Sequence, residues 1–588
     1  MKDVKKTFNN KKVEVEEMAR QVSIGSQSFE NLREKGCFYI DKTYFIRDWW
    51  KTEDQITLIT RPRRFGKTLN MNMLECFFSD RYAGRSDLFE GLDIWEDEEY
   101  RKLQGTYPVI NLSFAEVKSE NYQQCSDTIQ SIIKECYQLH SYLMDSEKLG
   151  EDAKQEYKDT INGISVGTEP IIVVRALKVL SKLLYQHTGT KPLIFLDEYD
   201  TPMQEAYLQG YWDELVSFIR NLFNATFKTN PYLGRAVMTG ITRVSKESMF
   251  SDLNNPNVCT VAVDQYATAF GFTEEEVFAS MDEFDMGSEK EKMGVKNWYD
   301  GFTIGNHHDI YNPWSITNFL RQKVFKTYWV NTSSNGMAGS VLQQADKNVK
   351  VLFEQLMQGK SIDVEMNDEM IFSQLGEKDE AIWALLLCSG YLKAEKVVTP
   401  EADGPARKPI FTLKITNRET EIMFEDLIHG WFGRDEANYN DFVKALLLGD
   451  VKFMNRYMNR VALNTISYFD VGKKPSQQAE PERFYHGFVL GLLVELKDRY
   501  AVLSNRESGF GRYDVVLEPK DKERDYAYIL EFKVYDEEDE EDLKATVANA
   551  LKQIEDKKYD TDLIAKGIPK ERIRKYGFAF EGQRVLIG

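Results

Sequence analysis

Cysteine is scarce in this sequence, and the usual marks of secretion and membrane insertion are missing. The six cysteines are scattered without a Cys-x-x-Cys pair, which argues against a disulfide framework or a zinc site and fits reduced thiols in a cytoplasm. No stretch of about 18 uncharged apolar residues occurs, so we expect no membrane span. The N-terminus is rich in lysine and lacks an apolar segment, so we expect no signal peptide.

The chain is acidic, and its size and composition set further limits. The net charge of −19 argues against a protein that coats nucleic acid through charge alone, although it leaves room for a local basic surface. A hydrophobic content of 42% and an aromatic content of 13% exclude wholesale disorder. With 588 residues the chain exceeds one hydrophobic core, so we expect about three or four domains. The acidic run from Asp536 to Asp542 is expected to be a solvated loop.

The segment from Gln55 to Leu69 predicts a phosphate-binding loop. Apolar residues 56–59 predict a buried strand, the next loop ends in Gly66-Lys67-Thr68, and the apolar residues after it predict a helix. Backbone N–H groups of such a loop and the helix N-terminus bind an anion together. We expect Lys67 to reach the β- and γ-phosphates of ATP and the Thr68 hydroxyl to hold Mg²⁺. An ordinary helix N-terminus is the alternative for a Gly-Lys-Thr sequence.

The loop departs from the general pattern G-x-x-x-x-G-K-[ST] at one position, because Arg61 stands where the first glycine belongs. The expected ATP contacts around Lys67 come from the residues Arg64, Phe65, Gly66, Thr68 and Leu69. Arg61, Arg63 and Arg64 either add phosphate contacts or pair with nearby acids. Upstream, Asp41, Lys42 and Thr43 either contact nucleotide or open an N-capped helix, and we favour the helix.

Two later strands are expected to complete the nucleotide site. Four apolar residues followed by Asp197 and Glu198 predict a buried parallel strand with two carboxylates at its carboxyl end, where ligands bind in open α/β sheets. Asp197 would hold Mg²⁺ through water, and Glu198 would orient or deprotonate the attacking water. The strand at residues 235–239 ends in Thr239, expected to sense the γ-phosphate. Arg243 either offsets transition-state charge or forms surface salt bridges.

The middle of the chain is expected to be largely helical. Residues 266–345 predict a small helical lid, in which Thr273 and Glu276 form a capping box. Residues 346–470 predict a winged-helix-like and helical region, with a helix, a hairpin and a second helix beginning near Arg418. Winged helices can bind DNA, but few basic residues lie here, so we favour a role in transmitting nucleotide state by packing. A polar, proline-bearing linker follows at residues 471–481.

The C-terminal segment predicts a second site. Its expected order is helix, three strands, helix, strand, with Asp514 on one strand and Glu531 and Lys533 on the next. Residues two apart in a strand face the same side, so Glu531 and Lys533 project together, and Asp514 can converge with Glu531 on Mg²⁺ or Mn²⁺. Lys533 would orient or activate a water that attacks a phosphodiester. The alternative is an exposed Glu531–Lys533 salt bridge, but both charges interrupt an otherwise apolar strand.

Other residues are expected around this second site. The backbone of Phe532 is a further expected metal contact, and Glu507 is a weaker one. Arg512, in a glycine-rich turn, is a candidate phosphate contact. The sequence leaves open whether Gln553 on the following helix faces this site.

Several separate motifs carry a family resemblance. They are Arg61-Pro-Arg-Arg-Phe-Gly-Lys-Thr68, Leu196-Asp-Glu-Tyr-Asp200, Trp298-Tyr-Asp-Gly-Phe302 and Tyr311-Asn-Pro-Trp-Ser315. Together they resemble the bacterial AAA-ATPase-like family, which typically ends in a PD-(D/E)XK nuclease-superfamily domain. Ser508-Gly-Phe-Gly-Arg-Tyr-Asp514 and Glu531-Phe-Lys533 match that ending, so the resemblance covers residues 22–588. The Gln553 to Tyr559 spacing departs from the Gln-x-x-x-Tyr of some nuclease relatives.

The resemblance implies an α/β multidomain fold. The expected parts are an N-terminal arm (1–21), a P-loop AAA-like ATPase domain with a parallel sheet covered by helices on both faces (22–265), the helical lid (266–345), the winged-helix-like region (346–470), the linker (471–481) and a PD-(D/E)XK-like αβββαβ domain (482–588).

Three functional hypotheses follow. The first is an ATP-binding and ATP-hydrolysing protein coupled to a Mg²⁺- or Mn²⁺-dependent nuclease acting on DNA or RNA in the cytoplasm, in defence or mobile-element biology by analogy only. The second is a nucleotide-switched binding or signalling protein whose nuclease-fold domain does not cleave. The third is a transcriptional regulator acting through the winged-helix-like segment. A homo-oligomer or a protein partner is compatible with each.

Overall fold

The structure is a computed structural model of the whole chain. It describes all residues except 1–19, 165–170, 244–255, 331–335, 346, 358, 368–373, 376–377, 401–406, 432–438, 466–488, 490–492, 494–495, 497–498, 505–506, 509–510, 513, 537–539 and 582–583. The chain divides into two compact units. The first contains residues 1–332, 367–372 and 384–394, and the second contains residues 333–366, 373–383 and 395–588.

The first unit is built on a five-stranded parallel sheet. Its strands are β1 (Ile56–Thr60), β2 (Val109–Ser113), β3 (Leu193–Asp197), β4 (Ala236–Gly240) and β5 (Asn257–Cys259), in the order β2-β3-β4-β1-β5. The strands β1, β3 and β4 are buried along their whole length, as their continuous apolar runs predict. Because β4 lies between β1 and β3, the carboxyl ends of these three strands are neighbours.

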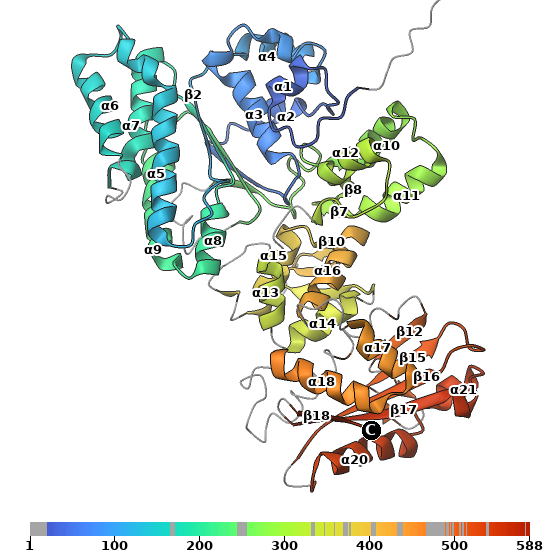
Figure 1. Cartoon of the computed structure of the whole chain (residues 1–588). Helices are drawn as coiled ribbons and strands as arrows, with labels where there is room; N and C mark the ends of the chain where they lie inside the picture. The colour runs from blue at the N-terminus through green and yellow to red at the C-terminus, as the bar shows by residue number, and fades with distance from the viewer. Residues whose placement is uncertain are drawn as a thin grey trace, which may run out of the picture. The chain divides into compact units, whose positions relative to one another are not determined.

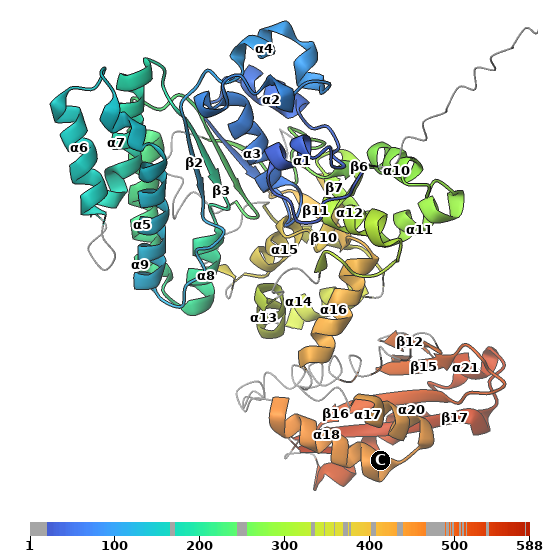
Figure 2. The same cartoon turned by 45° about the horizontal axis from the view of Figure 1, so that its top comes forward.

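Helices pack around this sheet. They are α1 (Phe29–Glu34), α2 (Tyr44–Lys51), α3 (Lys67–Phe78), α4 (Glu98–Leu103), α5 (Tyr122–Leu139), α6 (Glu151–Gly163), α7 (Ile171–Thr188), α8 (Thr201–Gln209) and α9 (Trp212–Phe223). Both cartoon views place α5, α6, α7 and α9 together beyond β2, and α1 to α4 in a separate group (Figures 1 and 2). The expected parallel sheet flanked by helices is therefore present. None of the described helices is both long and apolar enough to cross a membrane.

The expected helical lid is partly a sheet. It contains α10 (Glu274–Glu283), α11 (Glu289–Tyr299) and α12 (Pro313–Gln322), but also the antiparallel strands β6 (Phe272–Thr273), β7 (Phe302–Ile304) and β8 (His307–Tyr311) in the order β6-β8-β7. Gly305, with a φ of 56°, makes the tight turn between β7 and β8 possible. The Thr273–Glu276 capping box is confirmed at the start of α10.

The middle of the chain contains the helix, two strands and second helix that the sequence predicts, together with a further strand that it does not predict. The elements of this region are α13 (Gly336–Gln344), α14 (Lys347–Met357), β9 (Ile362–Glu365), α15 (Asp379–Cys388), β10 (Leu392–Val398), β11 (Ile410–Ile415) and α16 (Arg418–Trp431). The strands form a three-stranded sheet in the order β10-β11-β9. The helix, two strands and helix expected of the winged-helix-like segment are α15, β10, β11 and α16.

A five-stranded mixed sheet forms the C-terminal part of the second unit. Its strands are β12 (Tyr500–Ser504), β15 (Val515–Pro519), β16 (Ala527–Val534), β17 (Ile573–Glu581) and β18 (Arg584–Ile587), in that spatial order. Only β16 and β17 run parallel within it. The short strands β13 (Glu507–Ser508) and β14 (Gly511–Arg512) form a separate ribbon. The helices α20 (Leu543–Asp556) and α21 (Thr561–Ala565) lie between β16 and β17 in the chain.

Two helices that precede the expected linker share the core of this sheet. They are α17 (Tyr439–Leu448) and α18 (Val451–Thr465). Phe442, Met454 and Met458 are fully buried in one cluster with Phe532 and Phe578 of the sheet. The sequence assigns α17 and α18 to the middle region because the polar segment after them suggests a boundary. Their apolar sides instead complete the C-terminal core, and the whole of the expected linker (471–481) lies outside the described residues.

Two asparagines attach α18 to strand β18. The Asn455 side chain donates to the carbonyl oxygen of Ile587 and accepts from its N–H, both at 2.8 Å. The Asn459 side chain makes the same pair of bonds with Val585, at 2.6 and 3.0 Å. A primary amide offers one donor and one acceptor side by side, so each asparagine satisfies both backbone groups of one strand residue.

We predict that the double variant Asn455→Ala and Asn459→Ala loosens β18. Each substitution leaves a backbone N–H and a carbonyl without their partner, at a cost of about 1–3 kcal/mol per unsatisfied group if it stays dry. Hydrogen exchange of the Val585 and Ile587 amides should become at least tenfold faster, while the amides of β16 serve as the internal control. Unchanged exchange at both residues would contradict the assigned bonds.

Candidate functional site

The loop between β1 and α3 presents a row of backbone donors. Gly66, the residue before α3, has a φ of 82°, which glycine adopts without strain. In the part of the chain that the structure describes, no acceptor receives a hydrogen bond from the backbone N–H groups of residues 63–68. These groups and the N-terminus of the 12-residue helix α3 together form an anion-binding cradle.

Arg61 has a structural role that the sequence left open. Its guanidinium is fully buried and donates to five carbonyl oxygens, those of Thr60, Cys259, Thr260, Gln265 and Tyr266, at 2.8–3.1 Å. Burial lowers the pKa of this guanidinium to about 10. Arg61 therefore fastens the base of the loop to β5 and the segment after it, and this arginine is not a phosphate contact.

Lys67 lies inside the loop. Its ammonium donates to the carbonyl oxygens of Arg61 and Pro62, each at 2.9 Å. Burial lowers the pKa of Lys67, and the nearby carboxylates of Glu198 and Asp197 partly offset this effect. The side chain is thus held next to both the anion cradle and the acidic strand end.

Asp197 brings together three residues that the sequence predicted for one site. Its Oδ2 accepts a hydrogen bond of 2.6 Å from the Thr68 hydroxyl, and its Oδ1 accepts one from the Thr239 hydroxyl. Burial raises the pKa of Asp197, while these two hydroxyls act in the opposite direction. Carboxylate and hydroxyl oxygens are ligands that Mg²⁺ prefers, so Thr68 and Asp197 fit the metal of a bound nucleotide.

Glu198 has an unusual backbone conformation next to this site. Its φ is 51°, which costs free energy for a residue with a side chain and is typical of functional sites. Its carboxylate accepts a hydrogen bond of 3.2 Å from Thr201. Arg243 follows β4 at the same edge of the sheet and is half-buried. The catalytic role of Glu198 and the role of Arg243 remain predictions.

Asp200 is a residue of this edge that the sequence analysis did not single out. Its buried Oδ2 accepts hydrogen bonds from the backbone N–H groups of Ile241 and Thr242, from the Thr242 hydroxyl and from Gln204. The carboxylate therefore holds the segment after β4 against the end of β3. Its position three residues after Asp197, within the same motif, is the signal that could have identified it.

The outer part of the loop contacts the small-sheet region. Phe65 is buried against Phe302, with ring centroids 4.8 Å apart, and the Arg64 guanidinium lies 4.5 Å from the Trp314 ring centroid. The carbonyl oxygen of Arg63 accepts hydrogen bonds from the side chains of Asn312 at 3.1 Å and Trp329 at 3.0 Å. The Trp-Tyr-Asp-Gly-Phe and Tyr-Asn-Pro-Trp-Ser motifs thus shape the loop. Because the Phe65 side chain is buried, this residue can contact an anion only through its backbone N–H.

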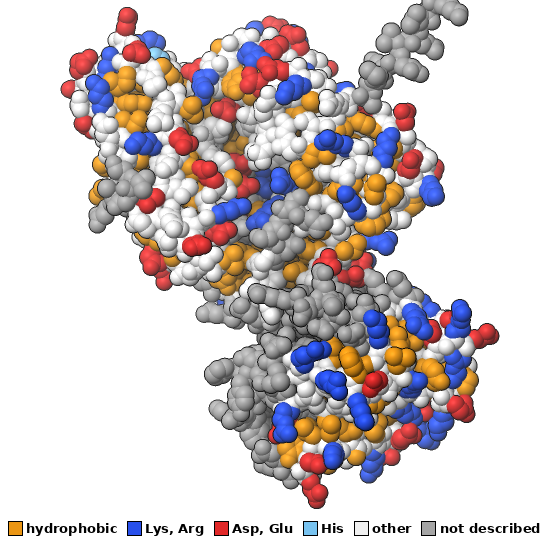
Figure 3. Space-filling view, in the orientation of Figure 1, with side chains coloured by type: hydrophobic (Ala, Val, Ile, Leu, Met, Phe, Trp, Pro, Cys, Tyr) orange, Lys and Arg blue, Asp and Glu red, His pale blue; other side chains and the backbone are white. Residues whose placement is uncertain are grey.

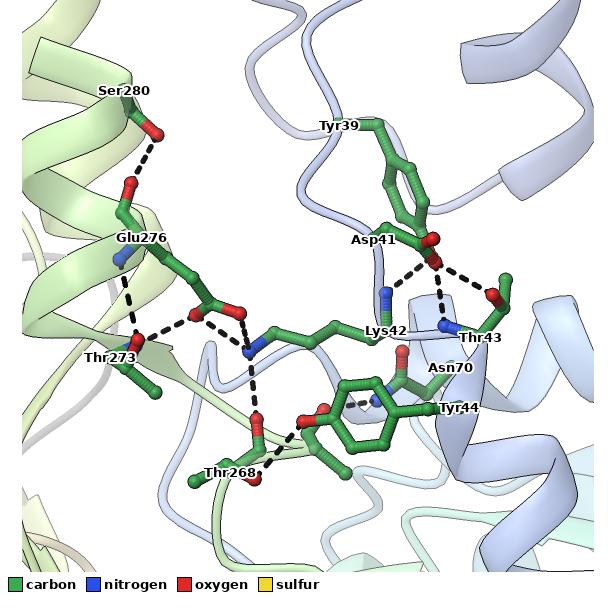
Figure 4. Close-up of polar contacts among 11 residues, drawn as sticks. Tyr39, Asp41, Lys42, Thr43, Tyr44, Asn70, Thr268, Thr273, Glu276 and Ser280 are labelled. Carbon is green, nitrogen blue, oxygen red and sulfur yellow. Dashed lines mark hydrogen bonds and ion pairs between the residues drawn. The ribbon is translucent and has the colours of Figure 1, made fainter. Parts of the chain in front are cut away.

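Lys42 is a buried structural residue. Figure 4 shows its side chain extending toward Glu276 and Thr268. The ammonium donates to both carboxylate oxygens of Glu276 and to the carbonyl oxygen of Thr268, each at 2.7 Å, and the residue is 4% exposed. Asp41 accepts from Thr43 at the start of α2. The structure therefore confirms the helix, although its N-cap residue Thr43 makes no side-chain capping bond, and the Lys42 ammonium is bound to Glu276 of α10.

Three carboxylates of the small-sheet region also lie together. Oxygen atoms of Glu274, Asp300 and Asp309 are within 4.8 Å of one another. Burial and the neighbouring Asp309 raise the pKa of Asp300 to about 7. Lys296 forms ion pairs with Glu274 at 2.6 Å and with Asp309 at 3.7 Å. Because this ammonium already offsets the negative charge, we read the cluster as structural.

The second predicted site is assembled on β15 and β16. Asp514 directly precedes β15, and its Oδ2 accepts a hydrogen bond of 2.8 Å from the backbone N–H of Phe532. This contact places Asp514 beside Glu531 and Lys533, which flank Phe532 on β16. Burial raises the pKa of Asp514 to about 6, and Lys533 partly offsets this effect. Glu531 is 1% exposed, and its Oε1 lies 4.0 Å from the Lys533 ammonium.

Gln553 belongs to this second site, which answers the question that its spacing left open. Its side-chain amide donates to Glu531 and, at 3.1 Å, to the Tyr559 hydroxyl. The six-residue separation from Gln553 to Tyr559 works because the chain turns after α20 and brings Tyr559 back to the same place. The side chains of Glu507 and Arg512 lie outside the described atoms, so their roles stay predictions.

The fold and the two sites define a class of protein. A parallel sheet with a phosphate loop and an Asp-Glu strand end is typical of P-loop nucleotide-binding proteins, and a mixed sheet with Asp514, Glu531 and Lys533 is typical of metal-dependent nucleases.

Comparison with known sequences agrees with both parts. Residues 23–250 match the family described as "Predicted AAA-ATPase", and residues 480–588 match the PD-(D/E)XK nuclease superfamily. The chain therefore carries an AAA-ATPase-like region and a C-terminal PD-(D/E)XK nuclease-superfamily region. A protein of Azotobacter chroococcum mcd 1, described as "Uncharacterized protein in vnfD 5'region", is 23% identical over 562 residues, which cover 94% of this chain and 95% of that protein.

We predict that Arg61→Gly, which would restore the general loop pattern, destabilises the first unit. The substitution leaves five carbonyl oxygens without their common donor, so we expect a loss of about 3 kcal/mol or more. Arg64→Gly is the matched control, because Arg64 is exposed and already has a positive φ of 64°. Thermal unfolding of both variants distinguishes them, and equal stability would show that the Arg61 bonds contribute little.

We predict that Gln553→Ala weakens divalent-metal binding at the second site. The lost amide no longer orients the Glu531 carboxylate, so the affinity for Mn²⁺ measured by isothermal titration should fall about tenfold to a hundredfold. The adjacent Lys552→Ala is the control, since Lys552 is exposed. A change of less than twofold in the Gln553 variant would argue against this positioning role.

Proposed function

We propose that this protein binds and hydrolyses ATP and couples the nucleotide state to metal-dependent cleavage of DNA or RNA. The observation that carries the nucleotide part is the double hydrogen bond of Asp197 to Thr68 and Thr239. It joins the helix after the phosphate loop to the ends of two strands, which is where Mg²⁺ and the γ-phosphate of ATP would be held.

The residues of the nucleotide site take distinct roles in this proposal. The N–H groups of residues 63–68 and Lys67 bind the phosphates, and Thr68 and Asp197 hold Mg²⁺, which offsets phosphate charge when bound. Glu198 accepts a proton from the attacking water. Thr239, bonded to Asp197, reports whether the γ-phosphate is present.

The C-terminal site supports hydrolysis of a phosphodiester. Asp514 and Glu531 would hold Mg²⁺ or Mn²⁺. The bound metal would offset the negative charge that develops on the phosphate, and it would activate a water for attack. Lys533 lies on the same side of β16 as Glu531 and orients that water. Gln553, on helix α20, donates a hydrogen bond to the Glu531 carboxylate and fixes its orientation.

A nucleotide-switched binding protein without cleavage is the second candidate. It is favoured by the net charge of −19, because such a chain repels a nucleic-acid backbone over most of its surface. This candidate predicts Lys67-dependent ATP binding and a conformational change, but no metal-dependent cleavage.

An assay of cleavage and ATP turnover separates the two candidates. Purified protein is incubated with plasmid, single-stranded DNA and RNA, with Mg²⁺ or Mn²⁺ and with or without ATP. We expect Asp514→Ala to abolish cleavage and to leave ATP turnover intact. We expect Lys67→Ala to lower ATP turnover at least a hundredfold and to alter cleavage, because the phosphates lose their buried cation. Lys51→Ala, an exposed lysine of the same unit, is the control.

Either result assigns the C-terminal site. Cleavage that depends on Asp514 supports the nuclease and identifies its substrate. An absence of cleavage on every substrate, with ATP turnover still dependent on Lys67, supports the switch and directs attention to a protein partner.

A further inference from the structure

The three arginines of the phosphate loop differ in how the protein satisfies their side chains. The Arg61 guanidinium donates to five carbonyl oxygens, and the Arg64 guanidinium lies over the Trp314 ring. The Arg63 guanidinium is partly buried and, among the described residues, forms no ion pair with a carboxylate. Its hydrogen bond within the described chain goes to Oε1 of Gln204 and is long, at 3.4 Å. Because a guanidinium has five N–H donors, most of the donors of Arg63 are open to a ligand.

A second cation of the loop lies near Arg63. Burial is the main cause of the lowered pKa of Lys67, and the positive charge of Arg63 lowers this pKa further. Two neighbouring cations repel each other, and an anion bound near both offsets the repulsion. Figure 3 shows a group of exposed Lys and Arg side chains near the middle of the first unit, below the place of α3 in Figure 1. This part of the loop therefore favours a ligand with a concentrated negative charge.

Gln204 fixes the direction of the Arg63 side chain. This glutamine belongs to α8, is 8% exposed and donates at 2.9 Å to Oδ2 of Asp200, while its own Oε1 accepts from Arg63. The same oxygen of Asp200 accepts hydrogen bonds from the backbone N–H groups of residues 241–242. The Arg63 guanidinium is therefore tied to the carboxyl ends of β3 and β4, the edge of the sheet at which the γ-phosphate of ATP is expected.

The backbone of Arg63 is held as well. Its carbonyl oxygen accepts hydrogen bonds from the side chains of Asn312 and Trp329, at 3.1 and 3.0 Å. Its N–H group is the first of the anion cradle, four residues before Lys67. A cation held at both its backbone and its side chain needs little reorganisation when an anion binds.

We propose that the Arg63 guanidinium binds the γ-phosphate of ATP and that Gln204 positions it, so that the site takes a nucleoside triphosphate in preference to a diphosphate. This inference rests on the proposed nucleotide function and adds to it the side chain that recognises the terminal phosphate. The planar guanidinium can donate two parallel hydrogen bonds to one phosphate group, which the ammonium of Lys67 cannot do.

The same contact would assist hydrolysis. The water oxygen forms a bond to the γ-phosphorus while the bond from that phosphorus to the bridging oxygen breaks. The water proton passes to Glu198, and the bridging oxygen leaves on ADP with the electron pair of the broken bond. Arg63 offsets the negative charge on the γ-phosphoryl oxygens during this step.

The test compares the binding of ADP and of AMP-PNP, an ATP analogue that resists hydrolysis, to the full chain with Mg²⁺ by isothermal titration. Arg63→Ala should lower the affinity for AMP-PNP about tenfold to a hundredfold, because a charge-assisted contact is lost. The affinity for ADP, which has no γ-phosphate, should change by about twofold or less. The kcat for ATP hydrolysis should fall at least about a hundredfold.

A second variant tests the positioning role of Gln204. Gln204→Ala leaves the guanidinium in place but removes its anchor, so the ratio of the AMP-PNP affinity to the ADP affinity should fall by a smaller factor, about threefold to tenfold. A merely structural role of Gln204 would weaken both nucleotides together and leave this ratio unchanged.

Two controls accompany these variants. Arg175→Ala removes an exposed arginine of α7 in the same unit and should leave both affinities and the turnover unchanged. Arg63→Lys keeps the positive charge, so it should bind AMP-PNP more tightly than Arg63→Ala does, although it lacks the planar fork of donors.

The outcomes separate this inference from the function on which it rests. If the wild-type protein binds both nucleotides and Arg63→Ala leaves the ratio of the two affinities unchanged, the inference is wrong and the nucleotide function stands. This holds whether both affinities fall together, as a disturbed loop would cause, or neither falls. If the wild-type protein binds neither nucleotide, the proposed nucleotide function and this inference fail together.

Discussion

The hydrogen bonds that Asp197 accepts are the constraint on which the candidate nucleotide site depends. Thr68 comes from the helix after the phosphate loop and Thr239 from the end of β4, so one buried carboxylate fixes three segments that are far apart in the sequence. The strand order makes this possible, because β4 lies between β1 and β3. A carboxylate buried to this degree needs strong donors, and the two hydroxyls provide them. Asp200, three residues further along the chain, is a second buried carboxylate that accepts hydrogen bonds from another segment. It holds the residues after β4.

The sequence was sufficient to predict that Thr68, Asp197 and Thr239 come together at one edge of the sheet, since each follows an apolar run that forms a buried strand or opens a helix. It was not sufficient for Arg61. A charged residue in a phosphate loop suggests a ligand contact, and only the folded chain reveals the carbonyl oxygens of residues 259–266 around its guanidinium. The antiparallel strands β6, β7 and β8 were also missed, because two to five residues between helices give little periodic signal.

At the C-terminal site the alternation along β16 predicted that Glu531 and Lys533 share a side, and the structure agrees. The orientation of Gln553 depends on the turn after α20, which brings Tyr559 back, and such a tertiary detail leaves no mark on local spacing. The membership of α17 and α18 in this core was hidden for a different reason. A polar segment separates them from the sheet in sequence, whereas their buried methionines and Phe442 contact it in space.

The attachment of α18 to β18 has a consequence for self-association. Strand β18 is at an edge of its sheet, and the free N–H and carbonyl groups of an edge strand can pair with a strand of another molecule. Asn455 and Asn459 occupy these groups at Ile587 and Val585 with their own amides. The helix therefore blocks edge-to-edge strand pairing at β18. While α18 is in place, the sheet cannot be extended from this strand into a second copy or a misfolded aggregate.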